Sequence, residues 1–431
     1  QRAVTRLREL VMIRLIGAQS MFNDHDRSVL RALADRVRQV ADSPEMAERR
    51  ALWRGHNALA PQRPMILVFP EGSWGELLPG SQLVCQDDKA RGWEWNLRSR
   101  LYGYDHFRSD NVVEADWTVQ RAIRSTGWGL SPRHHAATAE RGAWAFDPVV
   151  KSPDDLERMH FPEISVDDAA TEAEETLARE TFGDLLDVRT VGVAHLSYHL
   201  MNEWTGLRGL DQVYMDMVME PDFLHQAMRF LTDGHKHVLA QYIQLGLLSA
   251  NNDNTYQATG GNGYIDSLTP GAEGVVRTGE MWASAESQEL DPVSPEMHAE
   301  FAMAYESELL EPFALTGYGC CDGLHHKLRD VCAMPGMRRI SMSPFCKVDL
   351  AAPQVEDRFI FSWKPQPSHL VGRFDEDLIR NYLKHTIEVC RGGVLEIILK
   401  DTHTCEHRPE RFDRWTEICR ELVDEAADGW R

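Results

Sequence analysis

The sequence lacks several features that would mark other classes of protein. Its 431 residues include no apolar run near the roughly 18 residues that a membrane-spanning helix needs. The glycine-rich phosphate motifs GxGxxG and GxxxxGK(S/T) are both absent. An open, doubly wound nucleotide-binding sheet, the main rival fold, would need such a motif after its first strand. Internal repeats, low-complexity tracts and linkers are absent as well.

Positive charge is also scarce. Only 46 Lys and Arg residues stand against 67 Asp and Glu residues, which gives a formal net charge of −21. A surface this acidic repels phosphate backbones and anionic lipids. We therefore expect a small-molecule substrate, and neither nucleic acid nor a membrane as a partner.

The cysteine pattern and the first residues both indicate a cytoplasmic protein. Eight cysteines are scattered through the chain, unlike the framework of a small secreted domain, so we expect reduced thiols. Cys332, Cys390 and Cys419 fall within helical patterns and are expected in the core. Residues 1–19 predict a cationic amphipathic surface helix, because Arg8 and Arg14 interrupt the apolar run that a signal peptide would need.

The chain predicts an α/β protein with parallel strands. Residues 1–60 predict an N-terminal helical extension, and residues 61–431 a catalytic domain with a loop-and-hairpin insertion near 120–165. Short β-rich runs alternate with helical patterns, which is typical of a (β/α)8 TIM barrel. Helices are expected to begin at Ser294-Pro295 and Glu220-Pro221, and one to end at Gly392-Gly393. The expected strands cover 65–70, 112–119, 188–196, 247–254, 281–287, 314–320, 338–344, 358–365 and 394–401.

Polar side chains collect where these strands end, which is where a barrel carries its catalytic groups. Buried charge is costly unless it is paired, so convergence around one pocket explains the pattern best. We expect Glu286, Lys364, Lys400 and Asp401 to be catalytic. The expected substrate-binding residues are His199, Asp253, Gln288, Tyr318 and Trp282.

Some of these assignments have alternatives. Glu286 is a candidate general base, a metal ligand or an ion-pair partner for a lysine. Asp253, flanked by two asparagines, could instead stabilise a turn. The run ATGGNGY (258–264) predicts either a lid with glycine hinges or a plain surface loop.

Cysteine and histidine residues near two strand ends predict a zinc site. Adjacent side chains diverge, so we expect one of Cys320 and Cys321 to ligate. His403 and Cys405 share one face if their segment is extended. Thiolate and imidazole ligands suit Zn²⁺. The alternative is an unligated polar pocket.

Residues 60–425 resemble the uroporphyrinogen decarboxylase superfamily. The segment VGVAHLSYHLMNEWTGLRGLDQVYMDMVMEPDFLHQAMRFL and the later AESQELDPVSPEMHAEFAMAYESELLEPF with YGCCDGLHHKL carry the resemblance. True decarboxylases have an arginine segment after the first strand, whereas MILVFPEGSWGELLP has none. The other branch holds zinc-dependent methyltransferases that work with corrinoid proteins and carry H-x-C.

The resemblance to that second branch implies a ligand set. Tyr318 stands where the histidine of H-x-C is expected, Cys320 matches its cysteine, and Cys405 matches a further cysteine. The third ligand would come from His403, Glu286 or Asp322. A homodimer is the assembly that the resemblance favours.

Three functions follow as expectations. The first is zinc-dependent methyl transfer of the demethylase type, with cobalamin on a partner corrinoid protein. The second is a decarboxylase or other lyase, in which Lys364, Lys400 and His199 hold a small acid and protonate its carbanion. The third is a barrel that binds a ligand without catalysis.

Overall fold

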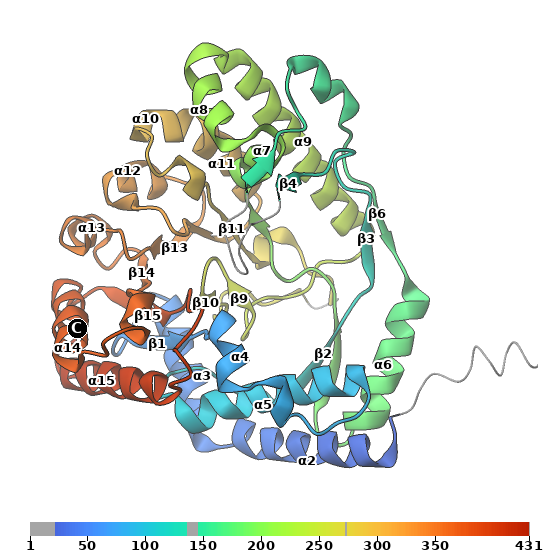
Figure 1. Cartoon of the computed structure of the whole chain (residues 1–431), viewed down its shortest axis with the longest axis vertical. Coiled ribbons are helices and arrows are strands. Elements are labelled where there is room, and N and C mark those ends of the chain that lie inside the picture. The colour runs from blue at the N-terminus through green and yellow to red at the C-terminus, as the bar shows by residue number, and fades with distance from the viewer. Residues whose placement is uncertain (1–21, 136–144, 272–273, 431) are drawn as a thin grey trace, which may run out of the picture.

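A parallel seven-stranded sheet forms the centre of this α/β protein (Figure 1). The computed structural model describes residues 22–135, 145–271 and 274–430, so the helix expected over residues 1–19 lies outside them. The strands of the sheet are β8 (Ser197–Tyr198), β11 (Trp282–Ala285), β12 (Leu315–Tyr318), β13 (Met337–Met342), β14 (Ile360–Trp363), β15 (Val394–Leu399) and β1 (Met65–Val68). The remaining strands are β2 (Asp116–Gln120), β3 (Ile123–Ser125), β4 (Arg133–His135), β5 (Ala145–Asp147), β6 (Ile164–Val166), β7 (Asp187–Val191), β9 (Tyr256–Gln257) and β10 (Gly261–Asn262).

Helices surround the sheet. Because both of its faces are covered, β11, β12, β14 and β15 are buried along their whole length. The longer helices are α2 (Asp24–Ala41), α3 (Pro44–Asn57), α5 (Asp88–His106), α6 (Asp168–Phe182), α7 (Leu200–Arg208), α8 (Leu210–Met219), α9 (Pro221–Gln244), α13 (Val348–Val355), α14 (Glu376–Val389) and α15 (Glu410–Ala427). The shorter ones are α4 (Trp74–Leu77), α10 (Pro295–His298), α11 (Ala304–Leu310) and α12 (Leu328–Val331).

The strand order is that of an unclosed barrel. The sheet runs β1-β15-β14-β13-β12-β11-β8, so the first strand of the chain lies beside the last. The two edge strands, β1 and β8, do not meet, and β2 and β7 form a separate parallel pair. The closed eight-stranded barrel expected from the sequence is therefore not completed within residues 22–135, 145–271 and 274–430.

The segment 247–254, expected to be a strand, is held to its neighbours mainly by the side chain of Asn251. That segment makes one isolated parallel bridge, between Val193 and Leu248. Beyond it, the Asn251 amide accepts from the Trp282 N–H at 2.9 Å and donates to the carbonyls of Trp282 and Ala194 at 2.9 and 2.8 Å. One asparagine thus satisfies three backbone groups of neighbouring strands, and a regular strand is not formed there.

The hairpin β9–β10 lies against the sheet near the middle of the molecule (Figure 1). A Cβ on Gly261 would lie 2.2 Å from Cζ of Arg339, a buried residue of β13, so only glycine permits this approach. Gln257, Asn262 and Tyr264 are buried as well. Both expectations for 258–264, a lid or a surface loop, are therefore wrong, because this segment fills space inside the fold.

Helix α3 contacts the sheet near the amino ends of its strands, whereas α2 packs against α5 and α6. Asn57, the last residue of α3, accepts from Nη2 of Arg339 at 2.7 Å and donates to the carbonyl of Tyr264 at 2.9 Å. Arg339 also pairs with Glu396 at 3.0 Å, and both side chains are fully buried. These contacts fix the end of α3 to the inner face of the sheet.

Local signals placed several helix ends correctly. The Ser294 hydroxyl accepts from the Met297 N–H at 3.2 Å, and Pro295 is the first helical residue. Helix α14 ends before Gly392, whose φ is +83°. The segment near 120–165 contains the short pairs β3–β6 and β4–β5 among its described residues. No helix in the described part of the chain is long and apolar enough to cross a membrane.

Candidate active site

The carboxyl ends of the parallel strands carry most of the predicted site. Glu286 directly follows β11, Lys364 follows β14 and Lys400 follows β15, while His199 follows β8. All neighbouring pairs in the sheet are parallel, so these residues lie at one edge. The sheet therefore brings together four of the residues that were predicted to act on a substrate.

His199 and Glu286 form a hydrogen-bonded pair. The Nδ1 atom of His199 contacts Oε1 of Glu286, and the carboxylate is held by the backbone N–H of Gln288 at 3.0 Å. The Glu286 side chain is 3% exposed, whereas the His199 side chain is 39% exposed. Burial lowers the pKa of His199, but the hydrogen bond and charge of Glu286 outweigh it and raise the pKa above its usual value. The pair is thus a buried carboxylate that favours the protonated form of an accessible imidazole.

Lys364 is a buried amine. Its Nζ donates to the carbonyl and the hydroxyl of Ser362 at 3.0 and 2.9 Å. Burial lowers the pKa of Lys364 to about 7, although the charge of Glu396 acts in the other direction. At neutral pH this lysine can therefore either hold or release a proton.

Lys400 is a persistent cation at the same edge. Its Nζ lies 3.7 Å from a carboxylate oxygen of Glu71 and 3.7 Å from one of Asp401, and 3.5 Å from the carbonyl of Thr259. Burial lowers the pKa of Lys400, but Tyr256, Asp401 and Glu71 together raise it above its usual value. Asp401 is half-buried with a φ of +58°, and its N–H donates to Glu71 at 2.7 Å. Asp401 acts here as a partner of Lys400.

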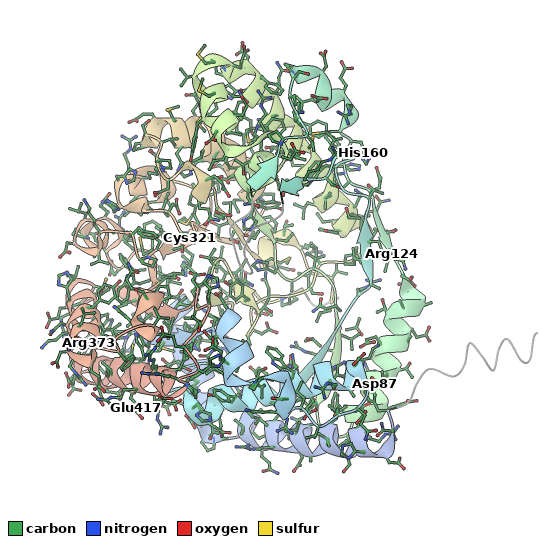
Figure 2. The ribbon with its side chains drawn as sticks, viewed as in Figure 1. Asp87, Arg124, His160, Cys321, Arg373 and Glu417 are labelled. Carbon is green, nitrogen blue, oxygen red and sulfur yellow. The ribbon has the colours of Figure 1, made fainter. Side chains whose placement is uncertain are left out.

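Cys320 and Cys321 lie on the loop after β12, and their sulfur atoms are 3.6 Å apart. Adjacent side chains were expected to diverge, and here they converge instead. The hydrogen bond between them raises the pKa of Cys320 and lowers that of Cys321, which is consistent with Cys320 as the donor. Cys321 is exposed, and Figure 2 labels it on this loop. The pair therefore presents one exposed thiol, Cys321, whose pKa is lowered by the hydrogen bond to its neighbour.

The four predicted zinc ligands are not brought together. Cys405 is buried, and its thiol donates to Glu76 at 3.2 Å. Burial, together with this carboxylate, raises the pKa of Cys405 to about 11. His403 is exposed on the same loop, so the two do not share a face. Within residues 22–135, 145–271 and 274–430 no group of three or more His, Cys, Asp or Glu side chains is placed to hold a metal ion. The residues present do not fit a zinc centre of the predicted kind.

Tyr318 was predicted to bind substrate, but its side chain points away from the carboxyl ends of the strands where Glu286 and Lys400 lie. Its hydroxyl donates to Glu306 at 2.8 Å and lies 2.8 Å from Nε2 of His298. Its neighbours Gly317 and Gly319 face the inner side, where a Cβ on Gly317 would meet Ala258 at 2.7 Å. Burial raises the pKa of Glu306 to about 8, so this carboxyl is mostly protonated at neutral pH. Tyr318 therefore belongs to a polar cluster between the sheet and its helices.

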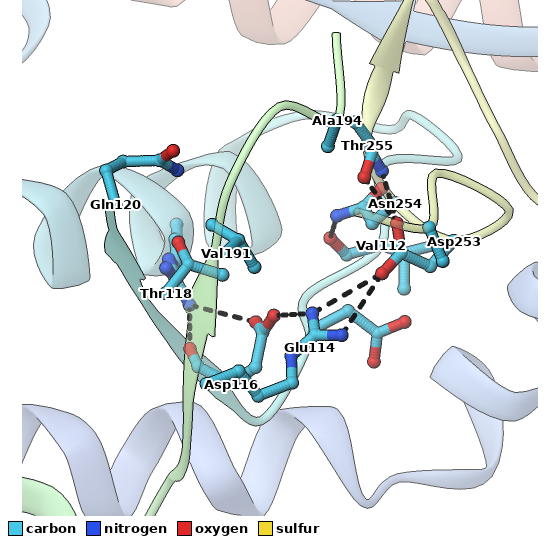
Figure 3. Close-up of a pocket in the computed structure, with 13 residues that line it drawn as sticks. Val112, Glu114, Asp116, Thr118, Gln120, Val191, Ala194, Asp253, Asn254 and Thr255 are labelled. Carbon is cyan, nitrogen blue, oxygen red and sulfur yellow. Dashed lines mark hydrogen bonds and ion pairs between the residues drawn. The ribbon is translucent and has the colours of Figure 1, made fainter. Parts of the chain in front are cut away.

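Trp282 and Asp253 also lie away from the edge. The Trp282 ring is 1% exposed and stacks under Arg339 at 5.0 Å, and its Nε1 donates to Gly263 at 3.1 Å. Asp253 accepts from the Thr255 N–H at 3.0 Å, as the turn alternative predicted. It lines a cavity of about 320 Å³, across which Asp116 faces it (Figure 3). Arg189 joins the two carboxylates, at 3.3 Å from Asp253.

The sequence did not single out Glu71 and Tyr256. Glu71 follows β1 and has a φ of +47°, a conformation that non-glycine residues seldom adopt. Tyr256 stacks edge-on against Phe69 at 5.5 Å, and its carbonyl lies 3.0 Å from Nδ1 of His195. Tyr256 lies beside Lys400 because of the β9–β10 hairpin, for which no local pattern gave a signal, whereas Glu71 lies there because β1 pairs with β15.

Comparisons with known proteins give a likeness in structure alone. No family model matches the chain, and no curated protein matches it. A solved structure of a methyltransferase from Methanosarcina mazei is similar, with 12% sequence identity and a TM-score of 0.48, covering 86% of this chain and 97% of that one. Similarity of this extent assigns no reaction or substrate, so the uroporphyrinogen decarboxylase resemblance remains a prediction.

Proposed function

We propose that this chain is an enzyme that removes a methyl group from a small substrate at the carboxyl edge of its sheet. The observation that carries the proposal is that a proton donor and a cation both follow strands of this sheet at their carboxyl ends. The Glu286-paired imidazole of His199 supplies the proton, and Lys400 supplies the charge. Both are needed when a heteroatom must leave with an electron pair.

The residues of this chain have separate tasks in that step. The bond between the methyl carbon and its oxygen or nitrogen breaks, and its electron pair stays on the heteroatom. Lys400 stabilises the negative charge that develops on the heteroatom, and protonated His199 donates a proton to it. Glu286 is a positioning residue, because it orients the imidazole and favours its charged form. His199 regains its proton from solvent between turnovers, because its side chain is 39% exposed.

The methyl group passes to an external nucleophile. A corrinoid on a partner protein, the acceptor that the family resemblance predicts, would supply that nucleophile, and no residue of this chain would hold it. No step uses zinc, since Cys405 and His403 do not approach the Cys320–Cys321 pair. Metal analysis of the purified protein tests this directly, and one tightly held zinc per chain would contradict it.

A second candidate is a carboxy-lyase, which the buried amine of Lys364 favours. A substrate carboxylate between Lys364 and Lys400 would lose its carbon–carbon bond, with release of CO2. His199 would then protonate the resulting carbanion. This reaction needs the same proton donor and no methyl acceptor.

One experiment separates the two candidates. Purified protein is incubated with free, reduced cobalamin and, in turn, ¹³C-methyl-labelled methoxyacetate, 4-methoxybenzoate and N,N-dimethylglycine. Methylcobalamin should form with at least one of them, and His199→Gln should slow the step by about 10²- to 10⁴-fold. His225→Gln is the matched control, because His225, on α9, also pairs with a glutamate, Glu300, but is not one of the residues at the candidate site.

The alternative outcomes are equally definite. Release of CO2 from an unmethylated acid, without methylcobalamin, would replace the first candidate by the second. An unchanged rate in His199→Gln would remove the assigned proton donor. Turnover of none of these substrates, with no CO2 from the parent acids, would contradict both candidates.

A further inference from the structure

A cavity of about 480 Å³ opens beside the candidate active site. It lies between the end of β1, helix α5 and the hairpin residue Tyr256. Aromatic rings dominate its walls: Phe69, Trp74, Tyr104, Phe107 and Tyr256. Glu71 and Tyr256, which border the cavity, are also the neighbours of Lys400. Through these two residues the cavity adjoins the edge where the reaction is proposed.

Arg100 supplies the cavity with a poorly neutralised cation. Its Nη1 donates to the carbonyl of Asp116 at 2.8 Å, but the nearest carboxylate oxygen of Asp116 is 3.8 Å away. Asp116 is engaged more closely by Arg189. Burial lowers the pKa of Arg100 despite the charges of Asp116 and Glu114. A half-buried guanidinium that lines a cavity and has only a distant carboxylate partner attracts an anion.

The charges in the cavity set the direction of a bound acid. Glu71 stands at the end near Lys400 and repels a carboxylate, whereas Arg100 lines the cavity from α5. Flat aromatic walls favour a planar apolar body through offset or edge-on ring contacts. Tyr104, which is half-buried, presents one such ring from the same helix as Arg100.

We propose that this cavity binds an aromatic carboxylate, with the carboxylate on Arg100 and the ring among the aromatic side chains. The substituent opposite the carboxylate then faces Lys400 and His199. This proposal rests on the function proposed above and names its substrate class. Arg100 is a specificity-determining residue under this assignment, and it has no part in the proton transfer.

The binding test uses the full chain and two fluorinated probes, 4-fluorobenzoate and fluoroacetate, titrated by ¹⁹F NMR. The wild type should bind 4-fluorobenzoate roughly tenfold or more tightly than fluoroacetate, because only the former buries a ring. Arg100→Gln should weaken 4-fluorobenzoate binding by roughly tenfold or more, and Arg100→Lys by less. Lys89→Gln is the matched control, since it removes an exposed cation of the same helix outside the cavity.

Tyr104→Leu provides a second, independent variant, because Arg100 also ties α5 to β2 and its loss could affect folding. Replacing the ring by an aliphatic side chain should weaken 4-fluorobenzoate binding several-fold and leave fluoroacetate unchanged. Equal binding of 4-fluorobenzoate by the wild type and Arg100→Gln would overturn the proposal. So would unchanged binding by Tyr104→Leu, or no binding by the wild type. Since no turnover is measured, these outcomes leave the function of His199 and Lys400 to its own test.

Discussion

Replacing Glu286 by glutamine should lower the pKa of His199 and move the alkaline limit of activity to lower pH. The carboxylate is almost fully buried and hydrogen-bonds the ring, so the interaction is a charge-assisted one. Such hydrogen bonds contribute about 1.5–3 kcal/mol. Because the ring is 39% exposed, solvent screening favours the lower end, and the pKa should fall by about one unit.

The direction of the His199 pKa shift also determines how stability changes with pH. A histidine whose pKa is raised on folding stabilises the protein fully below its unfolded pKa, and that contribution disappears as pH rises through the folded pKa. The free energy of unfolding of the wild type should therefore exceed that of Glu286→Gln by the largest amount below about pH 6.5. The His199 ring is titrated by NMR in both proteins, and the pH–rate profile is measured alongside.

A matched control is Glu300→Gln, which removes the carboxylate 3.3 Å from His225 on the surface. It should leave both the pKa of His199 and the rate profile unchanged. An identical His199 pKa in wild type and Glu286→Gln would refute the assigned coupling. A lowered pKa with an unmoved rate profile would instead refute the role of His199 as the proton donor.

Three further predictions concern other groups. Lys364→Met should raise the free energy of unfolding at pH 7 by about 1–3 kcal/mol in urea titrations, since it removes a buried amine. It should also abolish a rise in wild-type stability between about pH 7 and 10.5, where the unfolded chain binds the extra proton; a wild-type slope that persists in the variant would contradict this. Cys321 should react with iodoacetamide before the other cysteines, and Cys320→Ala should slow that reaction several-fold at pH 7 by removing the thiol donor, as followed by peptide mass spectrometry. Asn251→Ala should cost about 2–4 kcal/mol in denaturant unfolding, because it leaves the backbone groups of Trp282 unpaired; a loss below about 1 kcal/mol would refute this.

Part of the candidate site could be predicted without the structure. Apolar β-rich runs mark where strands end, and alternation with helices makes those strands parallel. The carboxyl ends of parallel strands lie at one edge, so Glu286, Lys364 and Lys400 could be assigned together. The adjacent thiols of Cys320 and Cys321 could also be placed near that edge, at the end of β12.

The mistaken assignments share a local cause. Tyr318 was singled out because it stands where the histidine of the superfamily's H-x-C is expected, but side chains alternate faces, and Gly317 and Gly319 take the inner positions. Cys405 and His403 were expected on one face of an extended segment. That segment is a loop organised around Glu76, which binds the thiol and the backbone N–H groups of Cys405 and His407.

The sequence by itself determined the elements of this protein and the chemistry available at the strand ends. Apolar periodicity, helix caps and terminal glycines act over a few residues, so they can be recognised along the chain. Only the tertiary structure decided that the sheet stays open, that residues 258–264 fill its inner side, and that Glu71, Arg100 and Tyr256 border one cavity. Those outcomes depend on packing between residues far apart in the chain, such as Gly261 against Arg339, and no local pattern encodes such contacts.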